Sequence, residues 1–412
     1  MADVARGRTA GLGGAFRWFL AGRAVSLLGS SMAPVALAFA VLDASGNPSD
    51  LGVVLAGRML PLLGFLLVGG VAADRFSRRA VLVVSSTGAG LTQGAVAVVL
   101  LTGHYGLLLV TVLEVTNGTL DAFTTPALRG VVPELVAPAA LQRASSVLAS
   151  TRNATKILGP SAAGILVVTV GSGAAIALDA LSFVVAAALL ARLDLPRPAR
   201  GAPSTLRRDL LEGWSAFRGT RWVVVVVAAS TVMNLVQTGT WQILGPALTE
   251  QRSGAATWGF VLTARGVGLL VASLLTARLV VRHLLRWGQL AVALVGLPLV
   301  ALGLQLGAAW LVASALVAGM ASAVGAIAWE TSIQEHVPRR VLSRVASLDD
   351  LFSYAAIPLG QLAVGPLAGA LGAPAVVLVA AVVFLAAATA PLLSRSVRDL
   401  PHRTGTGSSA TG

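Results

Sequence analysis

The sequence contains no cysteine, and only 11% of its 412 residues are charged. The absence of cysteine excludes disulfides, thiolate metal sites and cysteine nucleophiles. Histidine is also rare, with four scattered residues, so no histidine-based metal site is expected. A soluble domain has about 25% charged residues, which excludes an ordinary soluble globular protein. Disorder is excluded too, because 56% of the residues are hydrophobic.

Lysine is nearly missing, since Lys156 is the one lysine among 30 basic residues. No phosphate-binding loop of the type GxxxxGK[ST] precedes it, which argues against ATP-driven transport by this chain. The formal net charge of +13 would suggest nucleic-acid binding in a soluble protein. That interpretation fails if the basic residues lie in loops between membrane spans.

Long hydrophobic runs, by contrast, are abundant. A membrane-spanning helix needs about 20 mostly apolar residues. The first such run is too long for a signal peptide and leads directly into further spans, so it is expected to remain as an uncleaved helix. Twelve runs occur, near residues 17–42, 51–73, 80–101, 107–128, 144–169, 174–192, 222–248, 258–280, 287–306, 310–332, 346–370 and 374–393.

The basic residues alternate between the two sides of these spans. The two tails and the even-numbered connections hold 26 of the 30, whereas the odd-numbered connections hold Arg252 alone. Basic residues concentrate on the cytoplasmic side of membrane proteins. The pattern predicts a multi-pass protein with both termini cytoplasmic. The arginine-, alanine- and glycine-rich composition is typical of a GC-rich bacterium, and therefore of a protein in the inner (cytoplasmic) cell membrane.

One connection is long, and it divides the spans six plus six. Residues 193–221 begin with proline, arginine and glycine and continue as an amphipathic segment expected to lie on the membrane surface. The predicted domains are an N-terminal six-helix bundle (1–192), this cytoplasmic linker (193–221), a C-terminal six-helix bundle (222–393) and a disordered cytoplasmic tail (394–412).

The two halves resemble each other in sequence. At an offset of 207 residues, the intramembrane Arg58 aligns with Arg265. Weak internal symmetry of this kind is common in secondary transporters. We therefore expect duplicated six-helix halves. Further matches are Gly52 with Gly259, Arg75 with Arg282 and Arg79 with Arg286, and, at an offset of 201, Arg143 with Arg344, Ser146 with Ser347, Gly159 with Gly360 and Gly164 with Gly365.

The connection after the second span carries a recognisable motif. Residues 70–79, GVAADRFSRR, resemble the G-x-x-x-D-R-x-G-R-R signature of the major facilitator superfamily, with Ser77 in place of a glycine. Residues 141–164 are similar to the branch of macrolide-efflux and enterobactin-exporter-type carriers. The resemblance implies an all-α integral membrane protein of 12 transmembrane helices in two pseudo-symmetric bundles. It also implies alternating access, commonly driven by proton antiport.

The resemblance assigns a conformational latch to the motif residues. Asp74 would pair with an arginine and face a helix N-terminus of the opposite bundle, where the helix dipole favours a carboxylate. Alternatively, the arginines only set topology. The first span of the branch often carries an aspartate, for which this sequence has Ser30 or Ser31, so no coupling role is expected there. The latch residues are Gly70, Asp74, Arg75, Arg78 and Arg79.

Charged side chains within spans are costly and therefore indicate function. Their depths suggest pairs: Glu114 near Arg58, and Asp121 near Arg23. One of the two carboxylates on the fourth span would exchange protons during transport. The alternative is that both pairs are fixed and only stabilise the N-terminal bundle. The intramembrane charged residues are Arg23, Arg58, Glu114, Asp121, Asp179, Arg265 and Glu330.

A polar stripe on the seventh span predicts substrate contacts. Asn234, Gln237 and Trp241 share a helical face, and the resemblance implies that this span lines the cavity. Alternatively, the amides join neighbouring helices by hydrogen bonds. Arg265 would face an anionic substrate group or pack structurally, with Glu250 and Asp179 as candidate acidic partners. Three tryptophans at span ends, Trp222, Trp258 and Trp310, are expected to anchor the membrane interface.

Together these patterns predict a secondary active transporter that exports an amphipathic small molecule, such as a drug, antibiotic or siderophore-like product, by proton antiport. It would be no enzyme, would act as a monomer, and would use the proton gradient without a cofactor or metal. Its partners would be the substrate and the bilayer, and not nucleic acid. The alternatives are an uptake permease or a non-transport multi-span protein, although no convergent catalytic constellation supports an enzyme.

Overall fold

The computed structural model describes residues 13–75, 77–137, 140–193, 214–276 and 283–401, without the side chains of 66–75 and of some other helical residues, among them 125–126, 129–130, 141–143, 145–146, 339–340 and 343–344. Within these ranges the regular structure is helical, and no strand occurs. The chain divides into two compact units. Unit 1 comprises Met1–Pro203 and Gly254–Gly259, and unit 2 comprises Ser204–Ser253 and Phe260–Gly412.

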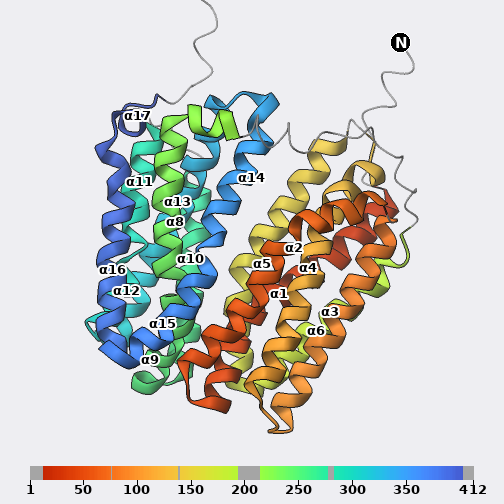
Figure 1. Ribbon diagram of the computed structural model, residues 1–412, viewed down its shortest axis with the longest axis horizontal. Coiled ribbons are helices and arrows are strands. Elements are labelled where there is room, and N and C mark those ends of the chain that lie inside the picture. The colour runs from red at the N-terminus through yellow and green to blue at the C-terminus, as the bar shows by residue number, and fades with distance from the viewer. Residues whose placement is uncertain (1–12, 76, 138–139, 194–213, 277–282, 402–412) are drawn as a thin grey trace, which may run out of the picture. The chain divides into compact units, whose positions relative to one another are not determined.

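Unit 1 is a bundle of six long helices that run alongside one another (Figure 1). Helix α4 packs on α2 and α3, and α6 packs on α1 and α3. A buried cluster that includes Phe16, Phe19 and Leu190 forms part of its core. The helices are α1 (Gly14–Ser45), α2 (Pro48–Arg75), α3 (Arg78–Leu101), α4 (Leu107–Leu135), α5 (Leu141–Val170) and α6 (Ser172–Leu190).

Unit 2 consists of the helices from α8 onward, except for the first residues of α10, and several of these helices are interrupted. Helix α8 packs on α15 and α16, and α11 packs on α13. The elements are α8 (Arg221–Gly239), the π-helical segment η3 (Thr240–Leu244), α9 (Gly245–Ser253), α10 (Ala255–Thr276), α11 (Leu284–Leu294), α12 (Leu297–Gly303), α13 (Ala308–His336), α14 (Arg339–Ala355), α15 (Ile357–Leu371), α16 (Ala373–Thr389), the 3-10 segment η4 (Ala390–Leu393) and α17 (Arg395–Arg398).

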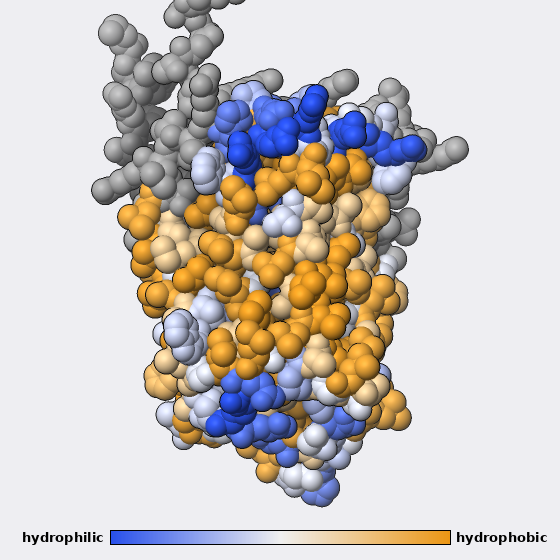
Figure 2. Space-filling view, turned by 90° about the vertical axis from the view of Figure 1, so that its left-hand side faces the viewer, coloured by the Kyte–Doolittle hydropathy of each residue, from blue (hydrophilic) through white to orange (hydrophobic). Residues whose placement is uncertain are grey.

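The helices are suited to a bilayer. In the described residues, 11 helical stretches are long and apolar enough to cross a membrane. The twelfth predicted span is α2, a 28-residue helix whose C-terminal side chains lie outside the description. Figure 2, viewed from the side of α16 and α12, shows a hydrophobic band with hydrophilic side chains gathered at both ends. Exposed residues such as Val379 and Val382 of α16 would be unfavourable in water but not in lipid.

Three predicted continuous spans of unit 2 are interrupted. The ninth breaks between α11 and α12, just before Pro298, and the eleventh breaks between α14 and α15, just before Pro358. The seventh widens into the π segment η3 just before Pro246. Proline cannot donate a hydrogen bond to the carbonyl four residues earlier, so the regular helical pattern is lost ahead of each one.

The sequence repeat has a structural counterpart at two helix crossings. In unit 1, a Cβ atom added at Gly118 of α4 would collide with the carbonyl oxygen of Arg58 in α2. In unit 2, a Cβ atom at Gly319 of α13 would collide with the carbonyl oxygen of Arg265 in α10. Small residues permit this close approach of helix backbones. The same arginine–glycine contact therefore recurs in both units.

The linker and tail predictions fall partly outside the description. Residues 194–213 are not described, and the helical residues 214–219 bring Trp214 and Phe217 into contact with Phe352 of α14. The tail, expected to be disordered from residue 394, instead begins with the helical turn α17. Val397 of this turn is fully buried in a hydrophobic cluster, so apolar packing orders the start of the tail.

Candidate functional site

The centre of unit 1 contains a guanidinium shared by two carboxylates. Arg58 of α2 lies with Nη1 3.6 Å from Glu114 Oε2, and its Nη2 donates to Asp121 Oδ2 at 3.2 Å. Both carboxylates belong to α4, seven residues apart, so they lie on one face of that helix. Gly118, which lies between Glu114 and Asp121 in sequence, lets α4 approach the backbone of Arg58 closely. Glu114 is fully buried, whereas Asp121 is 28% exposed.

A second layer of polar side chains holds Glu114 in place. Gln93 of α3 donates from Nε2 to Glu114 Oε1 at 3.0 Å. One turn along α4, Asn117 donates from Nδ2 to Thr92 Oγ1 at 3.0 Å. Gln93 and Asn117 are both buried. Buried polar groups need such partners, so the site is a connected network across α2, α3 and α4.

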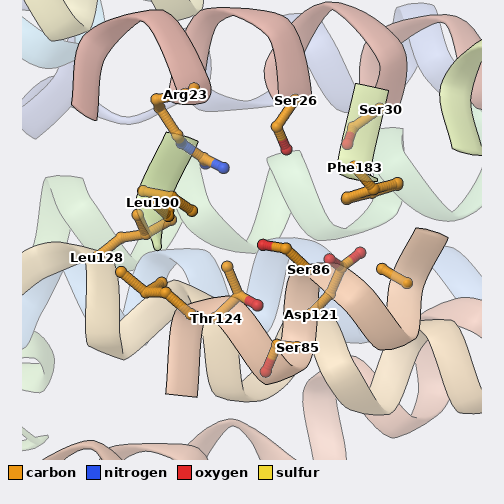
Figure 3. A pocket seen from close by; sticks show the side chains of 13 residues that line it. Arg23, Ser26, Ser30, Ser85, Ser86, Asp121, Thr124, Leu128, Phe183 and Leu190 are labelled. Atoms are coloured by element: carbon orange, nitrogen blue, oxygen red, sulfur yellow. The ribbon is translucent and has the colours of Figure 1, made fainter. Parts of the chain in front are cut away.

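Asp121 also faces a small cavity inside unit 1. The cavity volume is about 30 Å³, which suits roughly two water molecules. Figure 3 shows Arg23, Ser26 and Ser30 pointing from α1 toward the side occupied by Asp121 and Ser86. The hydroxyl-rich lining provides hydrogen-bond partners for water. The lining residues include Arg23, Ser26, Ser30, Ser85, Ser86, Asp121, Thr124, Leu128, Phe183 and Leu190.

The predicted pairing is therefore partly corrected. The structure brings Glu114 to Arg58, as the depths indicated, but Asp121 forms its ion pair with the same arginine. Arg23 lines the cavity beside Asp121 and interacts with it electrostatically. The depth of a residue in its span gives its height in the membrane but not the direction in which its side chain projects from the helix. Depth alone therefore did not reveal that Arg58 pairs with both carboxylates.

Sequence reasoning missed the place of a third carboxyl group. Asp179 of α6 was a candidate partner for Arg265, but it belongs to unit 1 and interacts electrostatically with Arg58, Glu114 and Asp121. It is fully buried. Its presence in a hydrophobic helix was the available signal, but its neighbours required the tertiary structure.

The described arginines of the signature motif act within unit 1. Arg78 pairs with Glu134 near the end of α4, and Arg79 donates to the carbonyl oxygen of Ala191 after α6. These contacts tie the first turn of α3 to two helix ends. The motif serine has a local role as well, because Ser77 Oγ accepts from the backbone N–H of Ala80 and caps α3. The side chains of Gly70, Asp74 and Arg75 lie outside the description, so the latch remains a prediction.

In unit 2, Arg265 has an aromatic partner. Its guanidinium carbon lies 5.1 Å from the ring centroid of Trp241, a cation–π contact. In the described part of the chain, no carboxylate forms an ion pair with Arg265. Phe260 and Val267 mark the exposed side of α10, seven residues apart, and Arg265 lies away from that side. Two of the four residues predicted for the substrate cavity, Trp241 and Arg265, are thus in direct contact.

The amides of the predicted polar stripe differ in role. Asn234 donates from Nδ2 to the carbonyl oxygen of Ser353 in α14 at 3.0 Å, which favours the helix-joining alternative for this residue. Gln237 is half-buried. Beyond it, Gln361 of α15 donates to Gln242 Oε1 at 3.0 Å, a pair that sequence reasoning missed. The π segment η3 positions Gln242, and π segments are frequent at functional sites.

Two of the three predicted interface tryptophans are instead buried. Trp222 packs edge-on against Trp329 and His336 in the core of unit 2. Trp258 is also buried, whereas Trp310 is 68% exposed, as an interface anchor would be. A span-end position does not distinguish a ring that faces lipid from one that faces the bundle.

Comparison with known proteins identifies the relatives of this chain. Residues 12–402 match the family described as transmembrane secretion effector. The multidrug efflux pump Tap of Mycolicibacterium fortuitum is 28% identical over 84% of this chain and 87% of its own. The enterobactin exporter EntS of Escherichia coli O127:H6 is 26% identical over 81% of this chain and 80% of its own.

Solved structures agree on the fold. The nucleoside transporter NupG superposes with a TM-score of 0.71 at 12% identity, covering 92% of this chain and 99% of that chain. A bacterial homologue of the iron transporter ferroportin gives a TM-score of 0.65 at 18% identity, and the match covers 91% of this chain and 98% of that chain. The family and these relatives are transporters and not enzymes. The chain, with its two helical units and its match over almost the whole length, belongs to the transmembrane secretion effector family of major facilitator superfamily transporters.

Proposed function

We propose that this transporter exports an amphipathic small molecule by alternating access in exchange for protons. The observation that carries the proposal is the position of Arg58 between Glu114 and Asp121. The relatives named for export of several drugs and of enterobactin support the direction and the amphipathic substrate class. The substrate would be a drug, an antibiotic or a siderophore-like product.

The shared arginine provides a mechanism for coupling. When both carboxylates are ionised, Arg58 faces two negative charges in a region of low dielectric constant. Protonation of a carboxyl group near Arg58 removes one negative charge and changes which carboxylates hold the guanidinium. The electrostatic attraction between α2 and α4 then changes, and this change biases the equilibrium between the two access states. The cavity beside Asp121 provides water-sized space for proton delivery.

The proposal places the protein in the cytoplasmic membrane with both termini in the cytoplasm. The arrangement of basic residues supports this orientation. The serine-lined cavity then lies toward the cytoplasmic half of unit 1, since Arg23 follows the N-terminal end of α1 by nine residues. The motif residues Asp74 and Arg75 would close the cytoplasmic side when the carrier faces outward.

Substrate recognition is proposed for unit 2. Trp241 is buried in this conformation and contacts Arg265, which has no described carboxylate partner. In a conformation that opens this site, Trp241 would offer an aromatic face and Arg265 a positive charge. A flat amphipathic molecule with an anionic or aromatic group would stack on Trp241 and approach the guanidinium. Gln237 would supply a hydrogen bond. Because these residues would make only a few specific contacts, the site would accept a broad range of substrates, as expected of a multidrug carrier.

Transport in lipid vesicles tests the proposal. The purified protein is reconstituted, a pH gradient with an acidic lumen is imposed, and uptake of ethidium and of an anionic aromatic dye is followed by fluorescence. We expect gradient-dependent accumulation of at least one dye, abolished by a protonophore. Glu114→Gln and Asp121→Asn should lose it, and the exposed Glu330→Gln should not. Accumulation that ignores the gradient would overturn proton antiport.

Direction is tested separately in cells. Expression should lower the steady-state content of the transported dye in energised cells, and a protonophore should restore it. An uptake permease would produce the opposite change. The measurement needs no knowledge of the natural substrate.

A further inference from the structure

The carboxyl group of Asp179 lacks the partners that an ionised carboxylate needs. Its Oδ2 atom is buried without a hydrogen-bond partner. Its Oδ1 atom lies 3.5 Å from the hydroxyl of Ser182, but that hydroxyl donates over the shorter distance of 2.7 Å to the backbone carbonyl of Asp179. An ionised carboxylate buried in this way is expensive unless paired.

The charges around Asp179 do not balance. Arg58 on α2 interacts with it electrostatically, as do Glu114 and Asp121 on α4. Arg58 already contacts both of those carboxylates. Arg23 lies beside Asp121, and the exposed Arg152 interacts with Arg23, but among the described residues the one cation that interacts with Asp179 itself is Arg58. A net negative charge within the bilayer is unfavourable, so one carboxyl group must bind a cation.

The close packing around Asp179 favours a proton over a larger cation. Helix α1 approaches so closely at Gly29 that the Asp179 and Ser182 side chains occupy the place of a Cβ atom. On the other side, α3 presents Gly90 to α6, also in close contact. In the described part of the chain, no group of three or more His, Cys, Asp or Glu side chains is placed to hold a metal ion.

The other two carboxyl groups are better satisfied. Glu114 accepts from Gln93 through Oε1, and its Oε2 accepts no hydrogen bond but lies 3.6 Å from Arg58 Nη1. Asp121 accepts from Arg58 at the edge of the cavity. We propose that Asp179 is the carboxyl group that binds the exchanged proton in this conformation, with Arg58 as the positioning residue that senses its charge. When the proton leaves, Asp179 becomes a third anion competing for Arg58, and the pairs on α4 must rearrange. This inference rests on the proposed proton antiport for its role in transport.

Infrared spectroscopy tests proton binding without transport. The protein in lipid should show the carbonyl stretch of a protonated carboxylic acid at neutral pH. The band should be missing in Asp179→Asn and remain in Asp121→Asn and in Asp50→Asn, a half-buried aspartate near the start of α2. A band that persists in Asp179→Asn would overturn the assignment. If wild-type vesicles showed no proton coupling while this band behaved as expected, the proposed antiport would fail and the protonation would stand.

Vesicle transport tests the role of that proton. Asp179→Asn mimics the protonated state permanently. It should lower dye accumulation driven by the pH gradient by about tenfold or more, the size of a typical coupling between two sites, while dye exchange without a gradient is retained. Ser182→Ala, which removes the neighbouring hydroxyl, should leave gradient-driven accumulation within about twofold, since a local hydrogen bond contributes little. Full gradient-driven accumulation by Asp179→Asn would overturn the proposal, as would loss of both activities together in a variant that remains folded by size-exclusion chromatography.

Discussion

One glycine in each unit lets a neighbouring helix approach the backbone of an intramembrane arginine. Gly118 and Gly319 leave no side chain between the helices, so the carbonyl oxygens of Arg58 and Arg265 contact the opposing backbone. The arginine side chains are therefore fixed at their base. Their outer ends differ, because Arg58 meets two carboxylates and Arg265 meets an indole ring. The same backbone contact thus supports two kinds of chemistry.

Replacing Gly118 by alanine should separate α2 from α4. The new methyl group collides with backbone, which cannot move aside cheaply, so we expect a loss of about 1–3 kcal/mol in unfolding free energy. Thermal unfolding in detergent measures it as a lower apparent melting temperature. Gly64→Ala is the matched control in α2, because a Cβ atom there meets nothing within 4 Å. Equal melting temperatures for the two variants would contradict the close crossing.

Replacing Arg265 by lysine should weaken substrate transport. Lysine keeps the charge but loses the planar group that stacks on Trp241. We expect a KM raised severalfold for an anionic aromatic dye and a smaller change for ethidium, since the latter does not require the cation. Uptake kinetics in vesicles provide both values. An identical change for the two dyes would argue for a structural role of Arg265.

At the scale of elements, helix ends and interruptions determine where polar groups lie. Ser77 departs from the glycine of the family signature, and the structure gives the reason: its hydroxyl caps α3. The π segment η3 precedes Pro246, which cannot donate to the carbonyl of Gln242. The same segment carries Trp241 and Gln242, both of which contact side chains from other helices.

Substitution of Ser77 should affect the start of α3 in a graded way. Ser77→Ala removes the capping hydroxyl and should cost about 1 kcal/mol, whereas Ser77→Gly should cost only a few tenths. Amide hydrogen exchange over the first turn of α3 reports the difference. Exchange should be faster in the alanine variant than in the glycine variant, and equal rates would show that the cap contributes nothing.

Replacing Pro246 by alanine should restore a regular helix through η3. The new N–H group can donate to the carbonyl of Gln242, which favours the α-helical pattern over the π turn. We expect a melting temperature at least as high as that of the wild type, together with slower transport because Trp241 and Gln242 are displaced. Pro374→Ala is the control, since Pro374 lies in the first turn of α16, where proline is tolerated. Unchanged transport by Pro246→Ala would show that η3 has no functional role.

At the scale of the whole molecule, the two units are repeats with different contents. The offset of 201 that relates Gly118 to Gly319 places Ala315 opposite Glu114 and Ser322 opposite Asp121. Unit 2 therefore lacks the α4 carboxylates that pair with Arg58 in unit 1. This asymmetry supports the proposed division, with proton coupling in unit 1 and substrate contact in unit 2.

The absence of cysteine makes the predicted orientation directly measurable. A cysteine introduced by His104→Cys lies between α3 and α4 and should react with a membrane-impermeant maleimide in intact cells. A cysteine introduced by Asp399→Cys, just after α17, should react only after the cells are permeabilised. The wild-type chain supplies the unlabelled background. The reverse pattern would invert the topology.

The prediction from sequence was strongest for features that depend on position along the chain. Hydrophobic runs located the helices, and the depth of Arg58 and Glu114 within their spans brought that pair together correctly. It was weaker for features that depend on rotation about a helix. Trp222 and Trp258 were assigned to the interface and are buried. Arg23 lies beside Asp121 as expected, but the ion pair of Asp121 with Arg58 was not predicted.

The sequence by itself determined the membrane-spanning all-helical architecture, the six-plus-six repeat and the family. A segment that crosses a bilayer must be a long apolar helix, and such helices are visible as hydrophobic runs in the sequence. The tertiary structure alone decided that Arg58 serves two carboxylates, that Asp179 joins them, and that Arg265 stacks on Trp241. These contacts join residues that are tens of residues apart. They depend on how neighbouring helices are rotated and how closely glycines let them approach, which no local pattern specifies.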